Sequence, residues 1–433
     1  MIIDEFIGFW SNAGSWKALR VFWYFFAFEL GRYVFFDFIV VLVYKCNRYL
    51  KHEDRVIAKE KLWAELPFVS VIVPGKNEGK HIYKLVRSLS EQTYKNFEII
   101  VVDDGSSDKT ALIGRDMERN GLVSLFLSNE VRGGKASAAN LAFRYAKGKY
   151  VLHLDADCSF HRDAIENSLF PFYMDPQLGA VGGNLEVRDP GKNICTSLQA
   201  IEYLKTIGIG RMVTSYLGIY SIISGAFGMF RKDVLDQVKG WDIGPGLDGD
   251  ITMKIRKLGY KVHFEPTAIG LTSVPNTFGK LAKQRLRWNK SIVRFRMRKH
   301  KDVFSPGAHF RFINFFASAE NIFFNVILNI LWYVHVSDMI VNFSDLLIYI
   351  LPMNLLLYTL ANFLQFWVVL MFSADYKNRL SLIPYLPLMV FYNGYYMRII
   401  KTLAHFREMF LWSSYNDPWN PSKSSQQAKR LKL

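Results

Sequence analysis

The sequence predicts an α/β domain, built on a mostly parallel sheet, that is joined to α-helical transmembrane and interfacial segments. Strand and helix patterns alternate from Pro67 onward, which is typical of repeated β-α-β units. Long uncharged runs lie near both ends of the chain, which is 50% hydrophobic and 15% aromatic. The formal net charge of +16 predicts either nucleic-acid binding or an anionic membrane surface together with an anionic substrate. The hydrophobic runs favour the membrane interpretation.

The N-terminal segment is predicted to contain a transmembrane helix. Val21–Tyr44 is apolar and aromatic, and it exceeds the roughly 20 residues that span a bilayer. Glu29 and Arg32 interrupt it, and because they lie three apart they either pair with each other or mark a contact with another helix. Four basic residues follow, so the positive-inside rule predicts that the next domain is cytoplasmic: Lys45, Arg48, Lys51 and Arg55.

Four short apolar runs after Pro67 are predicted strands. They are Phe68–Pro74, Phe97–Val102, Val123–Ser128 and Tyr150–Leu154. Helical patterns separate them, including Lys80–Gln92 and a helix of small residues that follows Gly133 and Gly134. Repeats of this kind bring the carboxyl ends of parallel strands to one edge, where open α/β sheets bind ligands.

Polar residues follow three of these strands, namely Asn77 and Glu78, Asp103 and Asp104, and Asp155 and Asp157. The last pair suits Mg²⁺ or Mn²⁺ bound to the phosphates of a substrate, although alone it also fits a solvated acidic turn. Carboxylates after the second strand can accept hydrogen bonds from a base or a ribose. Lys135 either reaches a phosphate or base or is a solvated lysine at a helix start.

A basic amphipathic helix is predicted over Lys280–Lys301. This stretch has ten Lys or Arg and no acid, with apolar residues at near-helical spacing. The pattern fits a cytoplasmic membrane interface, with the charges on anionic lipid, and it also fits a nucleic-acid-binding helix. The apolar runs that follow favour the interface.

Two further membrane spans are predicted, Asn321–Val341 and Leu346–Phe372, and the second has 27 residues without a charge. Leu382–Met397 contains two prolines and a glycine, and a full crossing would place the basic tail outside. We therefore expect a re-entrant or interfacial segment there. The tail after Trp412 is rich in Ser, Lys and Gln, and we expect it to be mobile.

Several segments, in this order and spacing, resemble an inverting family 2 glycosyltransferase with the GT-A fold. Four resemble its nucleotide-binding half: SVIVPGKNE, IIVVDDGSSDKT, GGKASAANLA and LHLDADCSF. Two resemble its acceptor-side segments: SGAFGMFRKDVL and GLDGDITMKIRKLGYKV. QRLRW (Gln284–Trp288) matches the Q-x-x-R-W signature of the processive members, which synthesise cellulose, chitin, hyaluronan and poly-N-acetylglucosamine.

The resemblance implies an inverting mechanism with a carboxylate base and Mg²⁺ or Mn²⁺. Asp248 matches the catalytic position, with Asp250 as an alternative register, and Leu247 stands where the family often has Glu. Asp157 and Asp155 are the implied metal ligands. The implied substrate-binding residues are Asn77, Glu78, Asp103, Asp104, Lys135, Asp155, Gln284, Arg287 and Trp288.

These patterns divide the chain into a transmembrane segment (1–45), a cytoplasmic GT-A domain (46–275), a basic interface helix (276–305), membrane or interfacial helices (306–400) and a cytoplasmic basic tail (401–433). We expect an integral protein of the plasma (inner) membrane that transfers N-acetylglucosamine or glucose from a UDP-sugar to a growing β-linked polysaccharide and translocates the polymer. The implied partners are the UDP-sugar, the polysaccharide acceptor, the lipid bilayer and any accessory membrane or export subunits, with no nucleic acid.

Two alternatives stay open. A non-processive membrane transferase would add one sugar to a lipid-linked acceptor, and QRLRW weighs against it. A membrane-anchored binding protein would keep the fold without catalysis, and the retained Asp104, Asp157 and Asp248 weigh against that.

Overall fold

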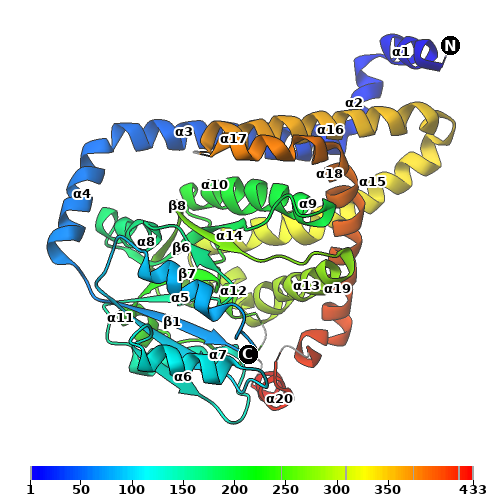
Figure 1. Ribbon diagram of the computed structural model, residues 1–433. Helices are drawn as coiled ribbons and strands as arrows, with labels where there is room; N and C mark the ends of the chain where they lie inside the picture. Colours follow the sequence, from blue (N-terminus) through cyan, green and yellow to red (C-terminus); the bar gives the residue numbers. More distant parts are fainter. Residues whose placement is uncertain (1, 245, 308–309, 374, 418–419, 432–433) are drawn as a thin grey trace.

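The computed structural model describes residues 2–431, apart from 245, 308–309, 374 and 418–419. An α/β domain fills the lower part of Figure 1, and long helices lie across the top of it. Among those helices are α3 (Asp37–Leu50) and α16 (Leu347–Phe372), while α19 (Met397–Leu411) descends along one side of the domain. The chain therefore folds as a sheet domain with a helical layer on one side.

Eight strands form one mixed sheet in the order β3-β2-β1-β4-β7-β6-β8-β5. Their bounds are Val69–Gly75 (β1), Phe97–Asp103 (β2), Leu125–Ser128 (β3), Tyr150–Leu154 (β4), Ser159–Phe160 (β5), Leu178–Val187 (β6), Phe227–Arg231 (β7) and Lys261–Thr272 (β8). The expected parallel arrangement is correct for β3, β2, β1 and β4. Beyond β4 the sheet is mixed, because β7 runs antiparallel to both of its neighbours, β4 and β6, whereas β6 and β8 pair in parallel.

The reversal at β7 matters for what lies at the edge of the sheet. Leu154, the last residue of β4, pairs with Phe227, the first residue of β7. In consequence the loop before β7, which contains Ser224 and Gly225, meets the end of β4 directly.

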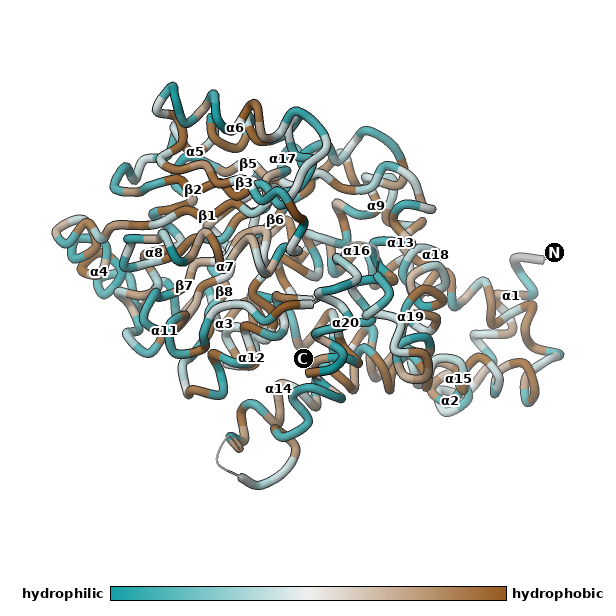
Figure 2. The backbone as a smooth tube through the Cα atoms, turned by 90° about the horizontal axis from the view of Figure 1, so that it is seen from below, coloured by the Kyte–Doolittle hydropathy of each residue, from teal (hydrophilic) through white to brown (hydrophobic). Residues whose placement is uncertain are grey.

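The four parallel strands are linked by three helices, of which the first and the third lie in stretches predicted to be helical. These helices are α5 (Ile82–Ser90), α6 (Thr110–Arg119) and α7 (Lys135–Tyr145). Strands β1 and β2 are hydrophobic over most of their length in Figure 2, and Val71, Ile72 and Val73 are completely buried. Each such side chain contributes about 1.5–3 kcal/mol relative to an exposed one, so the core fixes the strand ends.

The second half of the α/β domain adds helices on both sides of the sheet. They are α8 (Ala164–Met174), α9 (Ile194–Glu202), α10 (Arg211–Tyr216), α11 (Lys232–Gln237), α12 (Leu247–Lys257) and α13 (Phe278–Ser291). A π-helix, Tyr203–Gly210, joins α9 to α10, and another, Ile292–Lys299, continues α13 and leads to the 3₁₀ turn Lys301–Phe304.

Within the described residues, two helices are long and apolar enough to cross a membrane: Phe312–Asn342 and Ser344–Phe372. The first comprises α14 (Phe312–Ile322), a π-helical turn and α15 (Leu328–Asn342), and the second consists of a 3₁₀ turn and α16. They contain the two C-terminal spans predicted from the sequence. The predicted N-terminal span falls in α2 (Ser15–Tyr24), the π-helix Phe25–Phe36 and α3, and it is not one of these two helices.

The remaining helices lie at the two ends of the chain. Helices α1 (Ile2–Asn12) and α4 (His52–Glu65) flank the N-terminal helices. After α16 come α17 (Tyr376–Arg379), the 3₁₀-helix Leu380–Leu388, α18 (Met389–Phe391) and the π-helix Tyr392–Tyr396 before α19. The predicted re-entrant segment thus consists of short 3₁₀, α and π helices, and its position relative to a membrane stays a prediction.

Glu29 and Arg32 do not pair with each other, so that interpretation is wrong. Arg32 instead forms ion pairs with Asp37 and, at 3.7 Å, with Glu320 of α14. Glu29 accepts from Arg398 of α19 at 3.4 Å. The second interpretation, a contact with another helix, is therefore correct, because packing brings closer partners than the helical neighbour.

The sequence predicts that the positive charges of Lys280–Lys301 face anionic lipid, and this prediction is wrong for three arginines. Arg285, Arg294 and Arg296 are all buried inside the protein. Arg285 pairs with Glu202 at 2.8 Å, and Arg294 lies over the ring of Tyr415 at 4.6 Å. Partners from distant parts of the chain neutralise or cover these charges, so they are not available to lipid.

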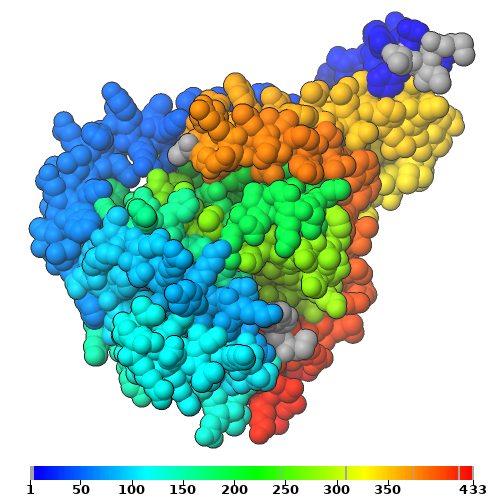
Figure 3. Space-filling view, viewed as in Figure 1, coloured from blue at the N-terminus to red at the C-terminus, as the bar shows by residue number. Residues whose placement is uncertain are grey.

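The expectation of a mobile tail is wrong for helix α20 (Ser422–Arg430). Ser425 and Ala428 in this helix are buried. Figure 3 shows the C-terminal residues, in red, lying against the cyan part of the α/β domain. Ser424 Oγ donates to the Gly133 carbonyl at 2.9 Å. Helix α20 is thus packed onto the turn that precedes α7.

Candidate active site

Asp155 and Asp157 leave the end of β4 at the edge where four parallel strands terminate. Lys135, the first residue of α7, forms an ion pair with Asp155. Burial alone would lower the pKa of Lys135, but Asp155 and Asp248 together raise it, so the ammonium group stays charged. Burial and the nearby Asp155 raise the pKa of Asp157. At this edge, therefore, Lys135 neutralises the charge of Asp155, whereas the charge of Asp157 is poorly neutralised.

Asp248 lies at the same place, in the first turn of α12. Burial raises its pKa, while Lys135 and the backbone N–H of Gly225 oppose that shift. Gly225 approaches so closely that a Cβ there would lie 2.5 Å from Asp248 Oδ1. Thr252 Oγ donates to the Asp248 carbonyl at 2.6 Å and accepts from Ile223 N at 2.9 Å. The loop before β7 is thus tied to the helix that presents Asp248.

Asp250 faces a different way from Asp248. It is buried and contacts His300 Nε2 at 2.7 Å and Lys299 Nζ at 2.8 Å. Two residues apart on a helix point in nearly opposite directions, so α12 directs Asp248 to the strand ends and Asp250 to the segment after α13. Of the two, only Asp248 interacts with Lys135 and Asp155.

Glu78 supplies a further carboxylate at this edge. Burial, followed by the charges of Asp157 and Asp155, raises the pKa of Glu78 to about 7. Among the residues that the structure describes, no group of three or more His, Cys, Asp or Glu is arranged to hold a metal ion by itself. The donors present are hard oxygens whose charges repel one another, which fits a divalent cation completed by ligand phosphates.

Asp103 and Asp104, at the end of β2, are engaged inside the protein. Asp103 accepts from the Ser106 N–H at 3.1 Å and from Ser128 Oγ at 3.1 Å. Asp104 accepts from the N–H groups of Gly133 and Gly134 at 2.7 and 2.8 Å. Both carboxylates shape the loops around the edge, and their contact with a nucleotide stays a prediction.

Asn77 has the same kind of local role. It adopts a left-handed backbone conformation, with φ of 59°, and its Oδ1 accepts from the Ser107 N–H at 2.9 Å. It therefore joins the turn after β1 to the loop after β2, and its contact with a substrate also stays a prediction.

The predicted QRLRW residues lie on α13, as the sequence indicated. Arg287 is close enough to Lys135 to lower the pKa of that lysine, so α13 reaches the strand ends. Gln284 Oε1 is buried and has no hydrogen-bond partner among the described residues. The Trp288 ring is 39% exposed and lies under Arg285 at 4.4 Å. Exposed aromatic and unpaired amide groups of this kind suit a sugar chain.

Sequence reasoning missed several residues at this site. His153 precedes Asp155 by two positions and hydrogen-bonds to the Gly225 carbonyl. Burial and Lys135 lower its pKa to about 4, so the imidazole is neutral. The sequence did contain a signal for His153, because it is a polar residue inside an otherwise apolar strand. The contacts of Gly225, Lys299 and His300 were not indicated by any local pattern, because their partners are distant in the chain.

Helix α20 closes one side of the same edge. A Cβ at Gly134 would lie 3.1 Å from Pro421 Cδ, and one at Gly244, before α12, would lie 3.0 Å from Ala428 Cβ. The C-terminal segment thus touches both the turn that holds Asp104 and the loop that leads to Asp248.

Comparison with known proteins gives this geometry a context. Residues 70–239 match the sequence profile described as Glycosyl transferase family 2. The chain is 36% identical over 221 residues to the poly-beta-1,6-N-acetyl-D-glucosamine synthase of Staphylococcus epidermidis, which covers 51% of this chain and 53% of that relative. The synthase of the same name from Staphylococcus aureus strain COL is 35% identical over 226 residues, with 52% and 54% covered. The chain thus spans about half the length of these relatives.

A solved structure shares the fold. It is the mannosyltransferase PcManGT from Pyrobaculum calidifontis in complex with GDP-Man and Mn²⁺. The match has a TM-score of 0.54 and 21% sequence identity, and it covers 86% of this chain and 99% of that one. At this identity the similarity establishes the GT-A fold alone.

Proposed function

Because residues 70–239 form a glycosyl transferase family 2 domain, we propose that the protein is a membrane-embedded polysaccharide synthase. It transfers N-acetylglucosamine from a UDP-sugar, with inversion, to a growing β-linked polymer, which passes across the membrane. The convergence of Lys135, Asp155 and Asp248 on one sheet edge is the observation that carries this proposal. The names of the staphylococcal relatives support N-acetylglucosamine over glucose.

Asp248 is the base in this mechanism. Burial raises its pKa, which makes the carboxylate a better proton acceptor, and the charge of Lys135 favours the ionised form. It removes the proton from the attacking hydroxyl of the acceptor as that oxygen bonds to the anomeric carbon and the bond to the diphosphate breaks. The neutral His153 and the Gly225 N–H hold Asp248 against the strand end without supplying a competing charge.

Asp157, with Asp155, would hold a Mg²⁺ or Mn²⁺ ion bound to the donor diphosphate. When bound, the cation takes up charge that develops on the departing diphosphate. Lys135 and Arg287 lie at the same edge and add positive charge toward the same leaving group. Glu78 and Asp104 lie on the side of the uridine, and Gln284 and Trp288 receive the acceptor sugar chain.

Membrane embedding is supported by the helices Phe312–Asn342 and Ser344–Phe372. Several of their apolar side chains are exposed, among them Val341 at 74% and Ile348 at 72%, and such surfaces favour lipid. Cys46 is the exposed cysteine of the chain, while Cys158 and Cys195 are buried. An impermeant thiol reagent should therefore label Cys46 only after the cells are opened, and labelling of intact cells would contradict a cytoplasmic α/β domain.

The activity is tested with the full chain in detergent, by measuring UDP release with Mg²⁺ or Mn²⁺ from a panel of UDP-sugars. We expect release from UDP-N-acetylglucosamine, long polymer as product, and loss of both in Asp248→Asn. Products with a single added sugar would overturn processive synthesis, and no release from any donor would overturn the enzyme assignment.

A further inference from the structure

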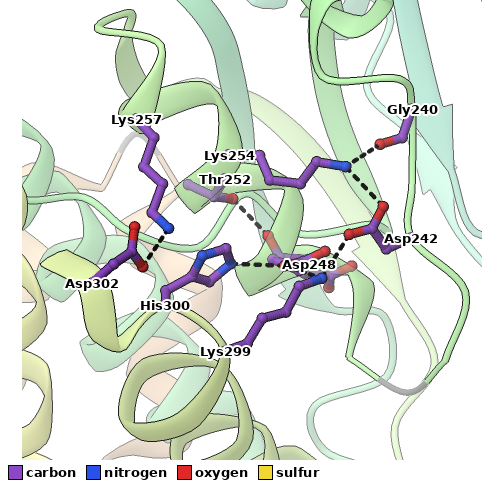
Figure 4. A network of polar contacts seen from close by, with 10 residues as sticks. Gly240, Asp242, Asp248, Thr252, Lys254, Lys257, Lys299, His300 and Asp302 are labelled. Atoms are coloured by element: carbon purple, nitrogen blue, oxygen red, sulfur yellow. Dashed lines mark hydrogen bonds and ion pairs between the residues drawn. The ribbon is translucent and has the colours of Figure 1, made fainter. Parts of the chain in front are cut away.

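A network of charged side chains lies behind α12, on the side away from the strand ends. Asp250 contacts Lys299 and His300, and Lys299 also pairs with Asp242 at 2.6 Å. Asp242 in turn accepts from Lys254 Nζ at 2.9 Å, and that lysine donates to the Gly240 carbonyl at 3.1 Å. Figure 4 labels Asp242, Lys254, Lys299 and His300 around the first turn of α12, together with Asp248 on that turn. Apart from Asp248, none of these residues has a role in the proposed chemistry.

The network neutralises Asp250 well. Burial opposes ionisation of this carboxyl, but the hydrogen bond from His300 and the charge of Lys299 hold its pKa below the ordinary range. Burial lowers the pKa of His300, so the imidazole is neutral near pH 7 and its Nε2–H donates to Asp250. Asp250 is 3% exposed, which makes this a fixed contact between α12 and the segment after α13.

Backbone packing reinforces the same junction. Gly246, which precedes α12, has φ of 84°, and a Cβ there would lie 2.4 Å from Phe295 Cε2. Gly244 has φ of 119°, and a Cβ there would lie 2.7 Å from an Arg294 guanidinium nitrogen. The loop before Asp248 can therefore approach the π-helix Ile292–Lys299 only because it is glycine-rich.

The segment that anchors Asp250 continues the helix that bears QRLRW. Helix α13 runs into the π-helix Ile292–Lys299 without a break, and His300 follows it directly. This continuous helix carries Gln284, Arg287 and Trp288 at one end. Its other end contacts α12 through Lys299 and the adjacent His300.

We propose that Asp250, Lys299 and His300 are positioning residues that hold Asp248 in register with the acceptor helix. The hydrogen bond between Asp250 and His300 fixes the first turn of α12 against the continuous helix that carries Gln284, Arg287 and Trp288. The base and the acceptor contacts then move as one unit relative to the donor at the ends of β1, β2 and β4. This inference rests on the proposed function, in which Asp248 is the base.

The test compares two substitutions of His300 in the full chain. His300→Gln keeps an N–H near the position of Nε2 and can still reach Asp250, whereas the shorter His300→Asn cannot. We expect His300→Asn to lower kcat at least about tenfold, because a small misplacement of a reacting group is costly. KM for UDP-N-acetylglucosamine should stay within about twofold, since the donor contacts are elsewhere. His300→Gln should restore most of kcat.

Two further measurements separate positioning from general destabilisation. In an Asp248→Asn background, adding His300→Asn should not lower the residual rate further, because the base that it positions is already absent. Lys257→Met is the matched control: it removes an ion pair of 2.7 Å with Asp302, from the same helix, and should leave kcat unchanged.

Equal losses of kcat and thermal stability in the Gln and Asn variants would overturn the positioning role, as would a fully active His300→Asn. An inactive wild-type protein would instead refute the proposed function itself, so the two failures are distinguishable.

Discussion

The ends of β2 and β4 each present two aspartates at the same sheet edge, but the protein treats the two pairs differently. Asp103 and Asp104 accept hydrogen bonds from serines and from backbone N–H groups of neighbouring loops. Asp155 forms an ion pair with one lysine, Lys135. Burial and the charge of Asp155 raise the pKa of Asp157. Similar sequence patterns therefore yield one pair that is hydrogen-bonded within the neighbouring loops and one pair in which Asp155 is neutralised by a lysine and Asp157 is not.

The same division separates the two acids of α12. Asp250 is neutralised by Lys299 and His300, while burial raises the pKa of Asp248. A carboxylate that the protein satisfies contributes stability, and one that it leaves poorly satisfied costs stability and gains reactivity. The variants below test whether this division holds.

The largest effect is expected from Asp157→Asn. Loss of a metal ligand should lower kcat/KM at least about 100-fold, because the cation contributes several kcal/mol to the transition state. Thermal stability should not fall, since burial and Asp155 disfavour the charge that is removed. Initial rates and Mn²⁺ binding by electron paramagnetic resonance would check this, and undiminished Mn²⁺ affinity would place the metal elsewhere.

A smaller loss is expected from Gly225→Ala. The added Cβ would lie 2.5 Å from Asp248 Oδ1 and 3.4 Å from His153 Cε1, so the carboxylate must move. We expect kcat to fall by about ten- to a hundredfold. Gly249→Ala is the control, because a Cβ there meets nothing within 4 Å and alanine favours the helix. Equal rates for both variants would show that the close approach of Gly225 is unimportant.

Glu78 predicts a dependence of stability on pH. Its pKa in the folded protein is about 7, above its ordinary value of 4.5, so the folded state binds more protons between these values. Stability from this group is present below about pH 4.5 and is lost as the pH rises to about 7. The Tm of metal-free protein should therefore fall over this range less in Glu78→Gln than in wild type. Parallel curves for the two proteins would contradict the raised pKa.

The smallest effect on turnover is expected from Asp103→Asn. Its carboxylate accepts from the Ser106 N–H and from Ser128 Oγ, so the change should lower the free energy of unfolding by about 1–3 kcal/mol. Urea titration in detergent and steady-state kinetics on the same samples would test this. A loss of activity as large as that of Asp157→Asn would erase the distinction between the two pairs.

Local sequence patterns were enough to predict the parallel strands β1, β2, β3 and β4 of the sheet. Strands β1, β2 and β4 are mostly apolar runs, and the acids lie at or soon after their ends, so both the strand ends and their chemistry could be inferred. The helical spacing of QRLRW placed Gln284, Arg287 and Trp288 on one helix for the same reason.

Features that depend on distant partners could not be predicted. Asp250 and His300 are 50 residues apart, and Arg285 and Glu202 are 83 apart. Helical spacing suggested a pair between Glu29 and Arg32, but residues from α3, α14 and α19 are the actual partners. The antiparallel β7 was missed because strand direction is not encoded in hydrophobic periodicity.

The contact between Ser424 and Gly133 joins residues 291 positions apart in the chain. During synthesis, the turn before α7 therefore emerges long before the helix that covers it, and both apolar helices must be made in between. The α/β domain can fold early on the ribosome, but this side of its ligand-binding edge is completed only after the helices have been synthesised. Full assembly of the sheet edge that holds Asp155 and Asp248 thus follows the synthesis of the helical layer.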